Sequence, residues 1–253
     1  MVNIKADLIL EGGGARCAFT LGLIDYFLDN DIYFENIYGV SAGSIVGAVF
    51  LARNRDLKDS LIRIIKNNSK EKQRNNKLID LVSTYKSFLS NYYSFDFQTF
   101  KNSKSKLYSV LLNAQTGQSE YISSDLIEDL DDLSKVIAGS CAVPMFAEEV
   151  SFKGSVYYDG GFSDPIPVFK SFNDRKNKKV VVLTRDIDYR KSYEPIKTDI
   201  SEIVPYPNVI FSSIVAANNL KSWNITEKYF KYSSLLIESI FFPFIKILPD
   251  DGL

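Results

Sequence analysis

The sequence predicts a three-layer α/β/α domain in which helices cover both faces of a mostly parallel central sheet. Three observations indicate this fold class. Short apolar segments typical of strands alternate with segments whose apolar residues recur at helical spacing. The segment Lys179–Thr184 (KVVVLT) has the continuous apolar run expected of a strand covered on both faces. Hydrophobic residues are 45% of the 253 residues and charged residues 24%, which suffices for one sizeable core.

We expect one domain over residues 1–253, because no internal repeat, low-complexity segment or linker divides the chain. Met1–Asp7 lacks the apolar stretch of a signal peptide. The apolar stretch Leu235–Leu248 is too short and too interrupted to span a bilayer. Cys17 and Cys141 are too few for a disulfide framework and suit a reducing compartment. These observations predict a cytoplasmic protein without a transmembrane segment.

In the first part of the chain, apolar periodicity predicts alternating strands and helices. We expect a strand at Asp7–Leu10, a helix at Ala15–Leu28, a strand at Phe34–Tyr38 and a helix ending near Ala52. Glycines follow both strands, and they break each strand sharply before the next helix begins.

The later elements follow from the same patterns and from turn residues. Helical spacing continues over 57–65 and 78–89. Downstream we expect a hairpin formed by strands at 107–112 and 119–122. A helix at 124–142 should stop before Pro144, and two further strands are expected within 148–158.

The chain contains no histidine, and this absence limits its chemistry. It excludes Ser-His-Asp triads, Cys-His dyads and His-ligated metal sites. Two cysteines cannot form a four-thiolate zinc site, so we predict no metal site. The net charge of −1, from 30 basic and 31 acidic residues, gives no indication of nucleic-acid binding.

Three consecutive glycines, Gly12, Gly13 and Gly14, lie between the first predicted strand and helix, with Arg16 just beyond. Their backbone N–H groups are unobstructed by side chains and can face a phosphate or a developing oxyanion. A tight turn without a ligand is the alternative. Nucleotide binding is weakly supported, because Cys17 stands where a dinucleotide fingerprint needs glycine and no P-loop lysine follows.

A second motif, Gly39-Val40-Ser41-Ala42-Gly43, is a G-x-S-x-G between a predicted strand and helix. Flanking glycines allow a sharp turn that presents the serine hydroxyl at the sheet edge. Serine needs a base to become a nucleophile, and without histidine that base must be a carboxylate or a lysine. Asp159, which ends a predicted strand before Gly160 and Gly161, is a candidate, although Asp-Gly-Gly alone is a common turn.

Together GGGAR, GVSAG and the distant DGG resemble the patatin-like phospholipases, which use a Ser-Asp dyad. SCAVPMF and FSDPIPV, on either side of the DGG segment, are also similar to stretches of bacterial members. The resemblance spans residues 7–184, and residues 221–253 match loosely. It implies a patatin-like fold and no cofactor. By this resemblance the nucleophile is Ser41, the base is Asp159, and the oxyanion-hole segment is Gly12, Gly13 and Gly14 with Arg16, supported by the motif glycines Gly39, Gly43, Gly160 and Gly161.

The resemblance implies hydrolysis of carboxylic ester bonds in phospholipids or lysophospholipids. The substrate is then a lipid or acyl ester, met by peripheral association with a membrane surface. The basic segment 66–77, with five basic residues and one acid, fits a solvated loop or a patch that attracts anionic lipid. Two alternatives remain open. One is a general carboxylesterase or acyltransferase with the same dyad, and the other is a catalytically idle lipid-binding relative, suggested by Cys17 where the family usually has glycine.

Overall fold

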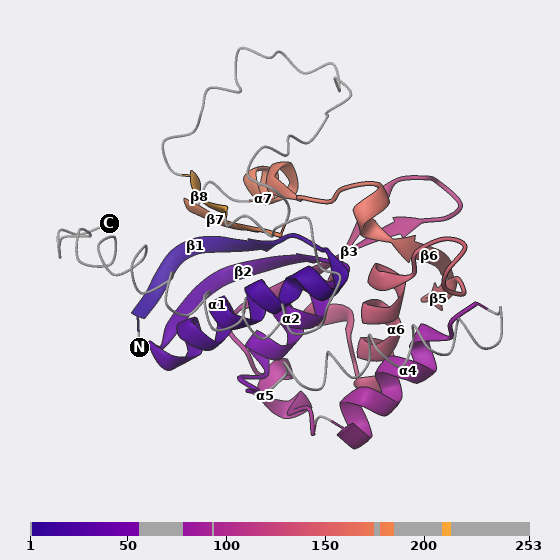
Figure 1. The fold of residues 1–253 in the computed structure, drawn as a ribbon, viewed down its shortest axis with the longest axis horizontal. Helices are drawn as coiled ribbons and strands as arrows, with labels where there is room; N and C mark the ends of the chain where they lie inside the picture. The colour runs from indigo at the N-terminus through magenta and orange to yellow at the C-terminus, as the bar shows by residue number, and fades with distance from the viewer. Residues whose placement is uncertain (1, 56–77, 93, 175–177, 185–208, 214–253) are drawn as a thin grey trace, which may run out of the picture.

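The computed structural model describes residues 2–55, 78–92, 94–174, 178–184 and 209–213. Their strands form one mixed sheet in the order β5-β6-β3-β2-β1-β7-β8, with β4 paired to β3 (Figure 1). The strands are β1 Val2–Leu10, β2 Ile32–Val40, β3 Lys106–Asn113, β4 Ser119–Ser123, β5 Val150–Phe152, β6 Ser155–Asp159, β7 Lys178–Leu183 and β8 Val209–Ser213. Neighbours among β1, β2, β3, β7 and β8 pair in parallel, and β4, β5 and β6 pair antiparallel. The predicted α/β fold with a mostly parallel sheet is confirmed.

Helices flank this sheet and continue directly from several strands. The α-helices are α1 Ala18–Asp29, α2 Ala42–Leu51, α4 Leu81–Ser87, α5 Phe97–Lys101, α6 Leu130–Cys141 and α7 Val168–Asp174. Short 3₁₀ turns are η1 Gly14–Cys17, η3 Ser124–Leu126 and η4 Gly160–Phe162, and η2 Phe88–Tyr92 is a π-helical turn. None of the helices in the described ranges is long and apolar enough to cross a membrane.

The sheet is buried on both faces, as the apolar run in β7 predicts. Leu8 and Leu10 pack into the large core that α1, α2 and α6 cover, whereas Ile9 between them packs on the opposite face with Tyr38 and Ile166. This alternation follows from the period of two along a strand. Every residue of α2 is buried, because this helix lies against the sheet between its neighbours α1 and α6 (Figure 1). Helix α7 lies on the other face (Figure 1).

Several predicted boundaries were wrong, and polar caps and strand pairing explain the differences. The helix expected from residue 124 begins at Leu130, because the Asp129 carboxylate accepts the Asp132 N–H and caps it there. Asp80 caps α4 in the same way, which shortens the helix expected over 78–89. The first strand is longer than 7–10, because β1 pairs with β2 from Val2 onward.

Other boundaries moved at the glycine loop and at the end of the second strand. The helix expected from Ala15 begins at Ala18, after the 3₁₀ turn η1. The strand expected over 34–38 extends over Ile32–Val40. The predicted helix at 57–65, the basic segment 66–77 and the tail 221–253 lie outside the described residues.

A buried ion pair ties three elements of the sheet and α7 together. Lys179 Nζ in β7 lies 2.6 Å from Asp7 Oδ2 in β1, and both side chains are fully buried. The same carboxylate accepts hydrogen bonds from Asn36 Nδ2 in β2 at 2.9 Å and from Ser171 Oγ in α7 at 2.7 Å. Lys179 Nζ also donates to the Ser171 carbonyl at 3.1 Å. With its hydrogen bonds supplied in this way, the pair is tolerated in the core.

We expect Lys179→Met to lower the free energy of unfolding by about 3–5 kcal/mol, because Asp7 would stay buried without this cation. Lys170→Met is the matched control, since the Lys170–Asp174 pair is 2.8 Å long but its side chains are 33% and 27% exposed. It should cost less than about 1 kcal/mol. Urea unfolding of both variants measures the difference. Equal costs would contradict a special role for the buried pair.

Candidate active site

The topology brings Ser41 and Asp159 together at the carboxyl edge of the parallel strands. Ser41 lies between β2 and α2, and Asp159 is the last residue of β6. Val110 in β3 lies opposite Val40 in β2, and the next residue of β3, Leu111, lies opposite Asp159. One strand therefore sets the relative position of two residues that are 118 apart in the sequence.

The two side chains are joined by a direct hydrogen bond. Ser41 Oγ donates to Asp159 Oδ2 at 2.7 Å. Ser41 is partly exposed, whereas Asp159 is only 4% exposed. A reactant can thus reach the hydroxyl from outside while the carboxylate remains behind it.

Ser41 has an unusual backbone conformation that the neighbouring glycines make possible. Its φ of 53° and ψ of −127° lie in a region that is strained for a residue with a side chain. A Cβ on Gly39 would lie 2.7 Å from the Gly43 carbonyl oxygen, and one on Gly43 would lie 2.4 Å from that of Leu10. The turn therefore requires glycine at both positions, which is the physical basis of the G-x-S-x-G motif.

Burial controls the protonation of Asp159. Desolvation raises the pKa of the Asp159 carboxyl above its ordinary value, although hydrogen bonds from the Gly161 N–H and from Ser41 lower it in part. The Gly161 N–H donates to Asp159 Oδ1 at 2.7 Å, and the Asp159 N–H donates to the Ala142 carbonyl at 2.9 Å. The raised pKa makes this carboxylate a stronger base than an exposed aspartate.

The glycine loop after β1 lies against the serine turn. A Cβ on Gly12 would lie 2.9 Å from Ser41 Cβ, so only glycine permits this approach. Gly13 and Gly14 have φ values of 144° and 56°. Thr184, at the end of β7, holds the loop: its hydroxyl donates to the Gly12 carbonyl, and a Cβ on Gly13 would lie 2.6 Å from its Oγ1.

Arg16 and Cys17 complete the loop and lead into α1. The Arg16 N–H donates to the Gly13 carbonyl at 3.1 Å, and a Cβ on Gly13 would lie 3.0 Å from Arg16 Nε. The guanidinium thus lies over the glycine loop. Cys17 is fully buried with ordinary helical angles, φ −63° and ψ −6°. This position accommodates a side chain without strain, so the cysteine does not distort the loop. Burial raises the pKa of its thiol to about 12, which keeps it protonated.

Sequence reasoning missed two buried polar residues that contact the site, Glu11 and Ser140. Glu11 is 1% exposed, and its Oε2 accepts the Thr184 N–H at 2.7 Å. Ser140, near the end of α6, is fully buried, and its Oγ accepts the Ser41 N–H at 2.9 Å. A serine within a predicted helix carries no periodic signal of function. Ser140 is the first residue of the stretch SCAVPMF, whose only signal in the sequence is its resemblance to a family.

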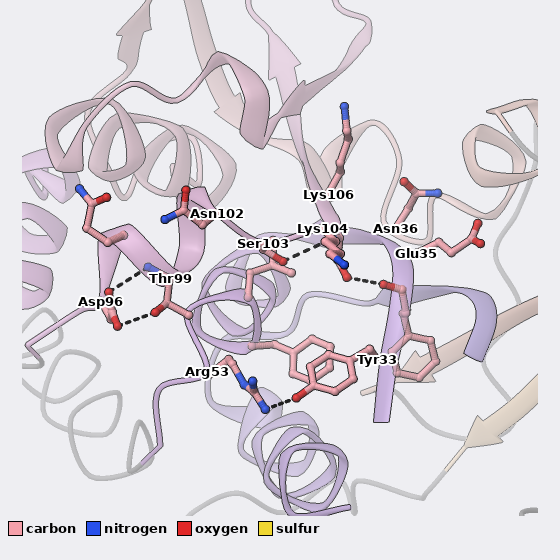
Figure 2. A pocket seen from close by; sticks show the side chains of 15 residues that line it. Tyr33, Glu35, Asn36, Arg53, Asp96, Thr99, Asn102, Ser103, Lys104 and Lys106 are labelled. Atoms are coloured by element: carbon pink, nitrogen blue, oxygen red, sulfur yellow. Dashed lines mark hydrogen bonds between the residues drawn. The ribbon is translucent and has the colours of Figure 1, made fainter. Parts of the chain in front are cut away.

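A separate pocket of about 770 Å³ is lined by residues at the start of β2 and β3, including Tyr33 and Lys106 (Figure 2). Ser41 follows the other end of β2. Tyr33 accepts a hydrogen bond from Arg53 there (Figure 2). Arg53 is also paired with Asp31. Lys106 is paired with Asp125. The charged side chains that line the pocket carry both signs, and some of them are already in ion pairs. The pocket therefore favours neither an anionic nor a cationic ligand. None of the predicted site residues lines this pocket.

Within the described ranges, no group of three or more cysteine, aspartate or glutamate side chains is placed to hold a metal ion. At the Ser41 edge the structure places a hydroxyl, a buried carboxylate and the backbone amides of the glycine loop. Such a set can activate a nucleophile and stabilise negative charge on a carbonyl oxygen.

Comparison with known proteins supplies a family and two similar proteins. The sequence model of the family described as "Patatin-like phospholipase" matches residues 8–170, a range that contains the glycine loop, Ser41 and Asp159. The uncharacterized Escherichia coli (strain K12) protein YjjU is 28% identical over 203 residues, 76% of this chain and 54% of that protein. The chain thus spans about half the length of this curated relative. The crystal structure of VipD from Legionella pneumophila aligns with a TM-score of 0.47 and 11% identity, covering 93% of this chain and 67% of that chain.

Because its folded-state pKa is raised, ionised Asp159 destabilises the fold at neutral pH. The neutral carboxyl is the stabilising form, and its contribution to the free energy of unfolding is fully present below the ordinary aspartate pKa. This contribution is lost as pH rises through the raised pKa of the folded state. We expect Asp159→Asn, which is always neutral, to melt at a higher temperature than the native chain at pH 7. The difference should shrink toward a pH of about 4. Calorimetry at both pH values checks this, and a lower melting temperature of the variant at pH 7 would contradict it.

Proposed function

The chain belongs to the patatin-like phospholipase family, and we propose that it hydrolyses carboxylic ester bonds of phospholipids or lysophospholipids through an acyl-enzyme on Ser41. The observation that carries this proposal is the 2.7 Å hydrogen bond from Ser41 Oγ to a buried Asp159 carboxylate. A binding protein has no use for a strained serine held against a base. Ester hydrolysis needs a nucleophile, a base and a site for the oxyanion, and the glycine loop beside Ser41 supplies the last of these.

In the first half of the reaction, Ser41 Oγ attacks the ester carbonyl carbon while Asp159 accepts its proton. The carbonyl oxygen becomes an oxyanion beside the Gly12–Gly14 loop, where each amide donor contributes about 3–4 kcal/mol in comparable hydrolases. The tetrahedral intermediate then expels the alcohol portion of the lipid, which takes the proton from Asp159. An acyl ester on Ser41 remains.

In the second half, water replaces the alcohol. Asp159 takes a proton from the water as its oxygen attacks the acyl carbon, and the same glycine loop receives the oxyanion. Collapse of the intermediate releases the fatty acid and returns the proton to Ser41 Oγ. Asp159 therefore serves as base and acid in both halves, a role that usually falls to histidine.

Exposed apolar side chains occur on the two chain segments that follow Asp159 and Ala142. Met145, Phe146 and Phe162 are 82%, 49% and 62% exposed. Phe162 follows Asp159 by three residues, and Met145 follows Ala142, which accepts the Asp159 N–H, by the same interval. Exposed apolar side chains on segments that hold the base favour a substrate with acyl chains over a small polar ester.

We expect Ser41→Ala to abolish labelling by a fluorophosphonate and release of fatty acid from a lysophospholipid. Asp159→Asn should slow both by about 10²–10⁴-fold, because it removes the base. Asp164→Asn is the matched control: Asp164 is 8% exposed and accepts the Tyr121 hydroxyl at 2.7 Å. The control should retain native rates. Labelling that persists in Ser41→Ala would remove Ser41 from the mechanism, and absence of both signals in the native chain would favour an idle lipid-binding protein.

The pH profile tests the role of Asp159 as the base. Because the carboxyl must be ionised to accept a proton, kcat/KM for an ester should fall as pH decreases through the raised pKa of Asp159. We expect the midpoint of this acid limb above the ordinary aspartate value of about 4. Initial rates with a soluble acyl ester over a range of pH measure it. A midpoint below that value would contradict a buried aspartate as base.

A further inference from the structure

The C-terminal end of α6 and the residue that caps it contact the backbone of both members of the dyad. Ser140 Oγ accepts the Ser41 N–H at 2.9 Å, and the Ala142 carbonyl accepts the Asp159 N–H at 2.9 Å. The two contacts come from residues only two apart on one segment. The end of α6 thus holds the serine turn and the end of β6 at the same time.

The Ser140 hydroxyl is fixed on several sides. It is fully buried, and it donates to the Val110 carbonyl of β3 at 2.7 Å. It also lies 2.9 Å from Ser44 Oγ, which donates to the Gly39 carbonyl at 2.8 Å. Gly39 precedes Ser41 in the sequence and Ser44 follows it. The Ser44 hydroxyl therefore connects the two ends of the serine turn, and the Ser140 hydroxyl lies against it.

The Val110 carbonyl connects this arrangement to the base. A Cβ on Gly160 would lie 2.2 Å from Val110 O, so the residue after Asp159 packs directly on the carbonyl that Ser140 holds. A displacement of Ser140 would therefore shift both Ser41 and Asp159, the two residues that the 2.7 Å hydrogen bond joins.

We propose that Ser140 is a positioning residue, whose hydroxyl holds the strained backbone of Ser41 so that Oγ stays within hydrogen-bond reach of Asp159. The reason is energetic. The strained backbone of Ser41, at φ 53° and ψ −127°, would relax if nothing held it, and the Ser140 hydroxyl accepts its part-buried N–H in this conformation. A misplacement of about 1 Å costs about 10²-fold in rate. This inference rests on the proposed function, because it assigns Ser140 a part in the reaction of Ser41.

The test compares Ser140→Ala with Ser134→Ala. Ser134 is the matched control, because it is fully buried in the same helix and its Oγ donates to the Leu130 carbonyl at 2.6 Å, without contact to the dyad. The readouts are the second-order rate of fluorophosphonate labelling, kcat and KM for a soluble ester, and the melting temperature. Should Ser140→Ala fail to fold, Ser140→Cys takes its place, since a thiol fills the same site but accepts a hydrogen bond weakly.

We expect Ser140→Ala to slow labelling and kcat by about 10²-fold with little change in KM, while Ser134→Ala stays within about twofold of native. The midpoint of the acid limb should also rise in Ser140→Ala, because the hydrogen bond from Ser41 that lowers the pKa of Asp159 is weakened. Native rates in the Ser140 variant, or equal losses in the two variants, would overturn the positioning role alone. No labelling of the native chain would overturn the proposed function together with it.

Discussion

The positive φ of Ser41 is the constraint on which the arrangement of the site depends. A serine at φ 53° projects its hydroxyl away from β2 just before α2 begins, and it can be placed there only if the backbone on both sides comes unusually close. Gly39 and Gly43 permit that approach from the two ends of the turn, and Gly12 permits the approach of the neighbouring loop. The backbone strain is therefore confined to Ser41, because the glycines around it have no Cβ that would clash with the neighbouring chain.

Two of the buried carboxylates, Asp7 and Asp159, have contrasting surroundings. Asp7 lies beside a buried lysine and accepts two further hydrogen bonds, so its charge is balanced within the core. Asp159 instead accepts hydrogen bonds from neutral donors, the Gly161 N–H and the Ser41 hydroxyl. A cation beside Asp159 would lower its pKa and weaken it as a base. Placing it among neutral donors keeps it basic, at a cost in stability that the rest of the fold must offset.

A direct serine–aspartate contact also explains how the proposed reaction can proceed without histidine. In a triad the imidazole bridges a hydroxyl and a carboxylate that do not touch. Here β3 and the end of α6 bring the two groups into hydrogen-bond contact, so the bridge is unnecessary. The direct contact between the two side chains replaces the bridging function that imidazole has in a triad. For this reason residues with no chemistry of their own, such as Ser140 and the Val110 carbonyl, matter to the reaction we propose.

The sequence alone determined the fold class, the serine turn and the chemistry excluded by the absence of histidine, because these depend on local patterns of apolar residues and glycines. It also singled out Asp159, although the pattern Asp-Gly-Gly is common and only its resemblance to a family distinguished it. Only the tertiary structure decided the rest. The start of α6 depends on a side-chain cap at Asp129, and the geometry of Cys17 depends on how η1 enters α1. The 2.7 Å contact between Ser41 and Asp159 and the role of Ser140 depend on which strand edges meet. Contacts between residues about a hundred positions apart are set by the packing of whole elements. A buried serine in an amphipathic helix leaves no local pattern that would reveal such contacts.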